Sequence, residues 1–145
     1  MSSRAQQLPQ RVAQAWNEGK VEIVDEVFAP NYASHPLWPN PVPFGPTDAS
    51  DRDQIKHSIK AFREQFPDLD VTLDETLEAG DKVVTRWTFR GTERNGKKVS
   101  WTSIVISRLA GGRVVEDWFL WDRLGFWQQL GIVPETRELQ AKERE

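Results

Sequence analysis

The chain has 145 residues, no cysteine and a net charge of -3, so it fits one domain and contains no disulfide, thiolate nucleophile or thiol-rich zinc site. The modest, scattered charge argues against nucleic-acid and anionic membrane partners, and without a signal-like apolar region or a run of roughly 18 apolar residues we expect a soluble, cytoplasmic protein. Seven tryptophans provide more large aromatic surface than a small core normally requires, which suggests that some of them serve a function.

The N-terminal region predicts two helices. Apolar residues recur every four positions from residue 8 to residue 17, at Leu8, Val12 and Trp16, and Gly19 ends this amphipathic pattern. A second, shorter helix is expected from Val21 to Phe28, and Pro30 ends it.

A proline-rich segment follows, from Asn31 to Ser50. Its five prolines exclude a helix or a central strand. It also carries Tyr32, Trp38 and Phe44, so it is no ordinary solvated linker. A long aromatic loop inside a compact domain is usually functional, and we expect it to cover a cavity.

The rest of the chain predicts one more long helix and then a sheet. The helix begins near Ser50, a capping residue, and ends at Pro67. Four strands follow, about 71–77, 82–92, 99–109 and 113–121, and they are joined by Gly80-Asp81, Asn95-Gly96 and Gly111-Gly112 turns. This order predicts an α+β domain in which N-terminal helices cover one face of an antiparallel meander. Residues 134–145 are expected to form a polar tail after a core of about 8–131.

The last strand carries apolar and acidic residues on both faces. Glu116, Trp118 and Asp122 share one face with Val114 and Leu120, while Asp117, Phe119 and Trp121 share the other with Val115. We therefore expect both faces of the sheet to be covered, one by the helices and one by a second subunit. We expect Asp122 to face the cavity, with Phe119 and Trp121 on the outer, subunit-facing side.

Asp122 has two interpretations. It can be the N-cap of a short final helix over residues 123–130. Alternatively, it points into an aromatic pocket, where desolvation raises its pKa and allows it to act as a general acid and base. Glu116 lies roughly 20 Å away along an extended strand, so the two do not form the close carboxylate pair of a glycosidase or an aspartic protease.

The histidines and Arg86 are weaker candidates. His35 lies in the proline-rich segment, where it can orient a carbonyl or relay a proton, or be merely structural; His57 reads as a surface residue. Arg86, in the stretch TRWTFR, fits either a half-buried strand or a base-stacking surface, and it can pair with Glu116 or with another acid inside the domain. No metal-ligand or nucleotide-binding motif is present in the sequence, so we expect no metal and no cofactor.

Several motifs resemble those of the SnoaL-like polyketide cyclases, a family of the nuclear transport factor 2-like superfamily. They are FAPNYASHP (Phe28 to Pro36), FREQFPDLDV (Phe62 to Val71), AGDKVVTRWTFRGT (Ala79 to Thr92) and GGRVVEDWFLWDRLGFWQQLG (Gly111 to Gly131). The chain departs from the family at Gly91-Thr92-Glu93, where a histidine is common in place of Glu93, and in the length of its proline-rich loop.

The resemblance implies a cone-like fold, in which a strongly bent sheet encloses an apolar cavity and oligomers form through its outer face. It also implies ring closure by intramolecular aldol condensation without metal or organic cofactor. The acid/base aspartate of the family corresponds to Asp122, its histidine to His35, and its Glu-x-Trp motif to Glu116 and Trp118.

These observations predict a cofactor-independent acid/base enzyme, a cyclase or isomerase, that acts on a hydrophobic carbonyl substrate. Asp122 is the expected acid/base, with His35 as its partner. The alternatives are a non-catalytic protein that binds a hydrophobic small molecule, an epoxide hydrolase-like enzyme, and a structural role. The residues expected to contact the substrate are Trp16, Tyr32, Trp38, Phe62, Phe66, Arg86, Trp101, Glu116 and Trp118.

Overall fold

The computed structural model describes residues 3–37 and 51–145. Five strands form one sheet: β1 (Phe28–Pro36), β2 (Asp70–Ala79), β3 (Lys82–Thr92), β4 (Lys98–Ala110) and β5 (Arg113–Trp121). The helices are α1 (Arg4–Glu18), α2 (Ile23–Val27), α3 (Arg52–Gln65), α4 (Arg123–Gln129) and α5 (Thr136–Glu143). None of the helices in these ranges is both long and apolar enough to cross a membrane.

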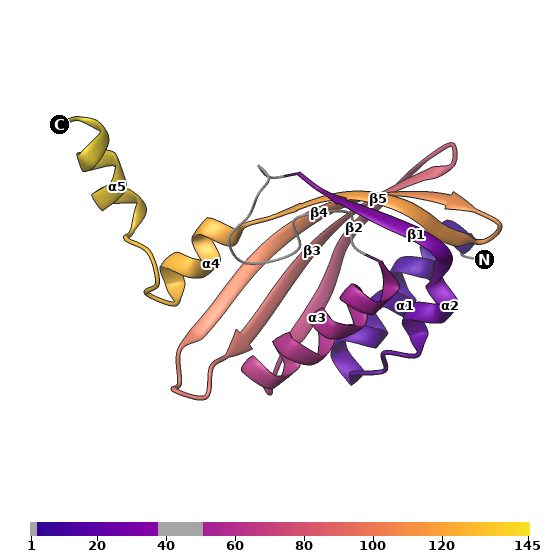
Figure 1. Cartoon of the computed structure of the whole chain (residues 1–145), viewed down its shortest axis with the longest axis horizontal. Coiled ribbons are helices and arrows are strands. Elements are labelled where there is room, and N and C mark those ends of the chain that lie inside the picture. Colours follow the sequence, from indigo (N-terminus) through magenta and orange to yellow (C-terminus); the bar gives the residue numbers. More distant parts are fainter. Residues whose placement is uncertain (1–2, 38–50) are drawn as a thin grey trace.

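The strands lie in the order β1-β5-β4-β3-β2, in a curled sheet that does not close. The predicted antiparallel meander from β2 to β5 is confirmed. Figure 1 shows α1, α2 and α3 on one side of the curled sheet, while α4 continues from the end of β5 and α5 projects away from the body. The predicted α+β class, with N-terminal helices packed on a bent sheet, is confirmed.

The first strand corrects the expectation for residues 28–36. The second helix was expected to reach Phe28 and a loop to begin at Asn31, but α2 ends at Val27 and β1 pairs in parallel with β5. An edge strand tolerates proline because one of its sides needs no hydrogen bonds, and the register shifts between Phe28 and Ala33, around Pro30. The first part of the expected cavity cover, residues 31–36, therefore belongs to β1, and residues 38–50, with Trp38, lie outside the described residues.

The helices are tied to the sheet by polar side chains as well as by apolar packing. The Asn17 side chain accepts a hydrogen bond from the Val71 N–H at 2.7 Å and donates one to the Val71 carbonyl at 2.9 Å. Arg63 on α3 donates to the carbonyls of Trp16 and Asn17 at 3.0 and 2.8 Å. These bonds fix the end of α1, and with it Trp16, against both β2 and α3.

A glycine sets how closely α3 approaches the sheet. Phe66, at the end of α3, is fully buried, and a Cβ atom added at Gly91 on β3 would lie 2.6 Å from the Phe66 Cβ. No side chain larger than hydrogen fits at that distance without a backbone shift. The helical layer therefore rests directly on the backbone of β3 at this point.

Candidate active site

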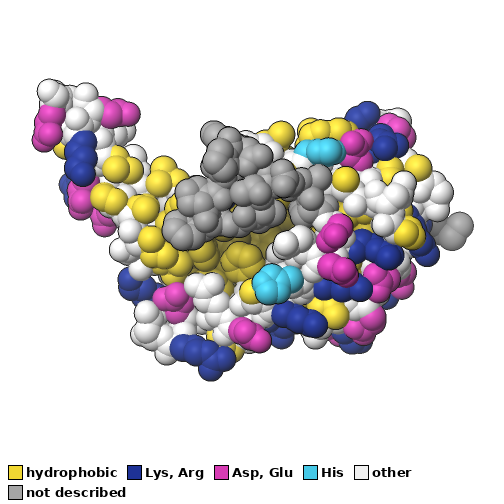
Figure 2. Space-filling model, viewed as in Figure 1, with side chains coloured by type: hydrophobic (Ala, Val, Ile, Leu, Met, Phe, Trp, Pro, Cys, Tyr) yellow, Lys and Arg dark blue, Asp and Glu magenta, His cyan; other side chains and the backbone are white. Residues whose placement is uncertain are grey.

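A cavity of about 680 Å³ lies between the helices and the concave face of the sheet. In Figure 2 it appears as a hollow in which hydrophobic side chains gather, with charged side chains around them. Alternate residues of β3, β4 and β5 point into it, together with side chains from α1, α3 and α4. The volume lies within the range of natural small-molecule sites.

One wall of the cavity is aromatic. Trp101 on β4 stacks on Phe89 of β3 with ring centroids 5.4 Å apart, and it meets Phe126 of α4 edge-on at 4.7 Å. Trp16 of α1 makes an edge contact with Phe89 at 5.1 Å, and Phe62 of α3 lies 5.6 Å from Trp101. Such interlocked rings form a stiff surface suited to flat, apolar molecules.

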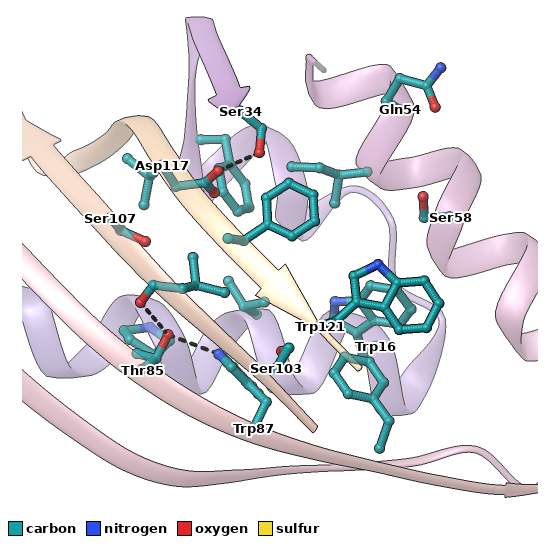
Figure 3. Close-up of a pocket in the computed structure, with 18 of the residues that line it drawn as sticks. Trp16, Ser34, Gln54, Ser58, Thr85, Trp87, Ser103, Ser107, Asp117 and Trp121 are labelled. Carbon is teal, nitrogen blue, oxygen red and sulfur yellow. Dashed lines mark hydrogen bonds between the residues drawn. The ribbon is translucent and has the colours of Figure 1, made fainter. Parts of the chain in front are cut away.

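At another part of the cavity a carboxyl group is buried. Asp117 of β5 is only 6% exposed and lines the cavity. Its Oδ2 accepts a hydrogen bond from the Tyr32 hydroxyl at 2.7 Å, and its Oδ1 accepts one from the Ser34 hydroxyl. Figure 3 shows Ser34 and Asp117 joined in this way. Both partners come from β1, where Ser34 is the direct neighbour of Asp117 in the parallel pairing.

Burial controls the protonation of this group. Desolvation raises the pKa of Asp117 above its ordinary value, while the hydrogen bonds from Ser34 and Tyr32 oppose that shift. Burial also raises the pKa of Tyr32, and the nearby Asp117 raises it further. Tyr32 therefore remains a neutral donor, and Asp117 is the group here that can gain and lose a proton.

Four of the expected substrate contacts lie at the cavity. Trp16, Tyr32, Phe62 and Trp101 all line it. Phe66 does not: it packs 5.4 Å behind Trp101 as a fully buried core residue. His57, read as a surface residue, is exposed but also borders the cavity from α3.

The expectation that Asp122 faces the cavity is wrong. Asp122 is exposed, and its carboxylate caps α4 by accepting the Gly125 N–H at 2.9 Å. Asp117, Phe119 and Trp121 line the cavity instead, so the inward face of β5 is opposite to the one expected. A bulge beside Val114 also interrupts the alternation, and Val114 faces inward with Asp117.

His35, Glu116 and Trp118 form a cluster outside the cavity, since they alternate along β1 and β5 with the residues that line it. The His35 Nε2 lies 2.9 Å from a Glu116 carboxylate oxygen, and Arg108 donates to the other oxygen at 3.1 Å. The hydrogen bonds from His35 and Arg108 lower the pKa of Glu116. The His35 ring stacks on Trp118 with centroids 5.5 Å apart.

Arg86 also lies on the outer side. It alternates along β3 with the cavity residues Thr85 and Trp87, and it pairs with Asp74 at 3.6 Å and Glu75 at 3.4 Å. The expectation that Arg86 pairs with an acid inside the domain is confirmed, but the acids are Asp74 and Glu75 of neighbouring β2 and not Glu116. Over residues 3–37 and 51–145, no group of three His, Cys, Asp or Glu side chains is arranged to hold a metal ion.

Comparison with known protein families assigns the chain to one of them. Residues 6–130 match the sequence profile of the SnoaL-like polyketide cyclases. The chain belongs to the SnoaL-like polyketide cyclase family. The resemblance carried by the sequence motifs is thus confirmed. Among curated proteins, no match to this chain was found.

Solved structures agree with this family assignment. A proposed polyketide cyclase from Bacillus cereus is 32% identical, with a TM-score of 0.74 over 87% of this chain and 79% of that one. IdmH, a proposed polyketide cyclase from Streptomyces antibioticus, is 26% identical, with a TM-score of 0.75 over 89% and 99% of the two chains. A Catenulispora acidiphila protein with a ketosteroid isomerase-like fold is 16% identical, with a TM-score of 0.69 over 87% and 93%; that likeness concerns the fold alone.

The capping role of Asp122 can be measured. Asp122→Ala should lower the free energy of unfolding by about 0.5–2 kcal/mol, because the Gly125 N–H loses its acceptor. Asp122→Asn should remain close to the wild type, since asparagine is an equally good cap. Urea unfolding of the three proteins gives the comparison, and equal losses in the two variants would contradict the capping role.

The buried Asp117 predicts a pH dependence of stability. Its folded pKa is raised, so the folded state holds the proton more tightly than the unfolded state does. The stabilising contribution is complete below the unfolded pKa of about 3.9 and is lost as the pH rises through the folded pKa. In urea unfolding above pH 4, the wild type should therefore lose stability relative to Asp117→Asn, by at most about 1.4 kcal/mol per pH unit. Parallel curves for the two proteins would contradict this assignment.

Proposed function

We propose that this protein closes a ring in a hydrophobic carbonyl compound by intramolecular aldol condensation, with Asp117 as the acid/base group. The observation that carries the proposal is the buried Asp117 carboxyl, which faces an apolar cavity and is held by Tyr32 and Ser34. A carboxyl whose pKa is raised by burial can both accept a proton from carbon and return it at moderate pH.

The reaction requires one proton carrier and no second reactant. The Asp117 carboxylate removes a proton from a carbon next to a carbonyl group, which gives an enolate. The enolate carbon forms a bond to a second carbonyl carbon of the same molecule, and the resulting alkoxide takes the proton back from Asp117. Tyr32 and Ser34 donate hydrogen bonds to the carboxylate, and these bonds hold it in position throughout the cycle.

Two further observations support this reaction class. The family and its similar solved structures, such as the proposed cyclases from Bacillus cereus and Streptomyces antibioticus, are associated with polyketide cyclisation. The aromatic wall of Trp16, Phe62, Phe89 and Trp101 suits the flat, apolar product of such a ring closure. The same wall also suits the alternative function, the binding of a hydrophobic small molecule without turnover.

Replacement of Asp117 tests the proposal. With 1-phenylhexane-1,5-dione as a hydrophobic model substrate, the wild type should accelerate ring closure, followed by the absorbance of the cyclohexenone that forms after loss of water. Asp117→Asn should reduce the rate by about 10²–10⁴-fold, because the amide cannot accept the proton.

Asp122→Asn is the matched control and should retain the rate of the wild type. Equal rates for the wild type and Asp117→Asn would contradict the acid/base role of Asp117. Binding of the dione by the wild type without acceleration would favour the non-catalytic alternative.

We also propose that the outer face of the sheet binds a second copy of this chain. Ile104 and Leu120 are directly paired on β4 and β5, and each is 51% exposed. Trp118 extends this strip, and Arg108 and Glu116 lie beside it. An apolar strip flanked by both signs of charge is self-complementary across a two-fold axis, so we expect a homo-oligomer.

Charge placed in the strip should separate the subunits. Ile104→Lys and Leu120→Lys should each shift the protein to the monomer, measured by size-exclusion chromatography with light scattering, because an ammonium group would be buried without a partner. Leu124→Lys is the control, since Leu124 is 50% exposed but lies on α4. A monomeric wild type, or variants that stay oligomeric, would contradict the proposal.

A further inference from the structure

Two serines interrupt the apolar inward face of β4. Ser103 and Ser107 line the cavity on the same strand as Trp101, Val105 and Leu109. Both are half-buried, and Figure 3 shows them among the side chains at the cavity wall. A serine at such a position gives up apolar contact and adds a hydroxyl group.

The other hydroxyl groups that the sheet presents to the cavity are already used within the protein. Tyr32 and Ser34 donate to Asp117. Thr85 accepts the indole N–H of Trp87 at 2.8 Å. By contrast, the side chains of Ser103 and Ser107 have no hydrogen-bond partner among residues 3–37 and 51–145. A polar group enclosed without a partner costs free energy, so a ligand that fills the cavity must offer one.

The strand register places Ser107 beside the acid/base group. Ser107 is the direct cross-strand neighbour of Asp117, and Ser34 is the neighbour of Asp117 on its other side. Directly paired residues have Cβ atoms about 4.5–5.5 Å apart. Since Ser34 and Tyr32 occupy one side of the carboxyl group, Ser107 supplies a hydroxyl on the opposite side.

Ser103 lies further along the same face. It is paired with Trp87 on β3 and with Trp121 on β5, so it lies between these two tryptophans on the inward face of the sheet. It lies four positions from Ser107, which corresponds to about 13 Å along an extended strand. Val105 and Phe119, a directly paired apolar couple, occupy the wall between them.

We propose that Ser107 and Ser103 are specificity-determining residues for an elongated, mainly apolar ligand with a hydrogen-bonding oxygen at each end. One oxygen binds Ser107 beside Asp117, and the other binds Ser103 between Trp87 and Trp121. The inference rests on the proposed function in one respect: the end of the ligand that binds Ser107 is the end that reacts.

Two rigid probes that differ by one hydroxyl test the spacing. 4,4′-Dihydroxybiphenyl has an oxygen at each end, whereas 4-hydroxybiphenyl has one and can place it at either serine. The wild type should bind the dihydroxy probe about 2- to 12-fold more tightly in isothermal titration calorimetry, which corresponds to one net hydrogen bond. Ser103→Ala and Ser107→Ala should each abolish that preference, while Ser100→Ala, an exposed serine of β4, should retain it.

A preference that survives in both alanine variants would overturn the inference, as would a wild type that binds the two probes equally or binds neither. The result is distinguishable from failure of the proposed function. Binding preferences as expected, together with full turnover by Asp117→Asn, would reject the acid/base role and keep the ligand class. Loss of turnover in Asp117→Asn, together with a probe preference that is unchanged in the serine variants, would support the acid/base role and reject the proposed ligand class.

Discussion

Burial of the Asp117 carboxyl is the constraint on which the rest of the site depends. A carboxyl group that is almost fully removed from water must be given hydrogen bonds or be neutralised, and both of its oxygens find donors on β1. Those donors are available because β1 runs parallel to β5 and brings Ser34 level with Asp117. The parallel edge strand, rather than the antiparallel meander, therefore creates the polar part of an otherwise apolar cavity.

Much of the fold could be predicted because it is encoded locally. Glycine and asparagine turns marked the hairpins between β2, β3, β4 and β5, and apolar periodicity marked α1 and α3. The capping of α4 by Asp122 was also one of the two predicted interpretations. The edge strand was missed because prolines at both ends of a short segment read as a loop, and parallel pairing leaves no local signal.

The choice of the inward face of β5 could not be made from the sequence. Each face carries an acid and large aromatic side chains, with Asp117 and Trp121 on one and Glu116 and Trp118 on the other. What separates them is the partner that each acid finds: hydroxyl donors inside the cavity for Asp117, and the cationic Arg108 with His35 outside it for Glu116. Those partners lie on other strands, so only the three-dimensional pairing distinguishes a buried neutralisable acid from an ion-paired one.

The contact between Gly91 and Phe66 has a consequence for redesign of the cavity. A helix seated directly on a strand backbone cannot move outward or inward without disturbing the core, so the end of the cavity beneath α3 has a fixed depth. The β4 wall is different, because its serines are small and only half-buried. Substitutions on the β4 wall can therefore change the shape of the cavity without a shift of the backbone, whereas any side chain at Gly91 would displace Phe66 and the end of α3.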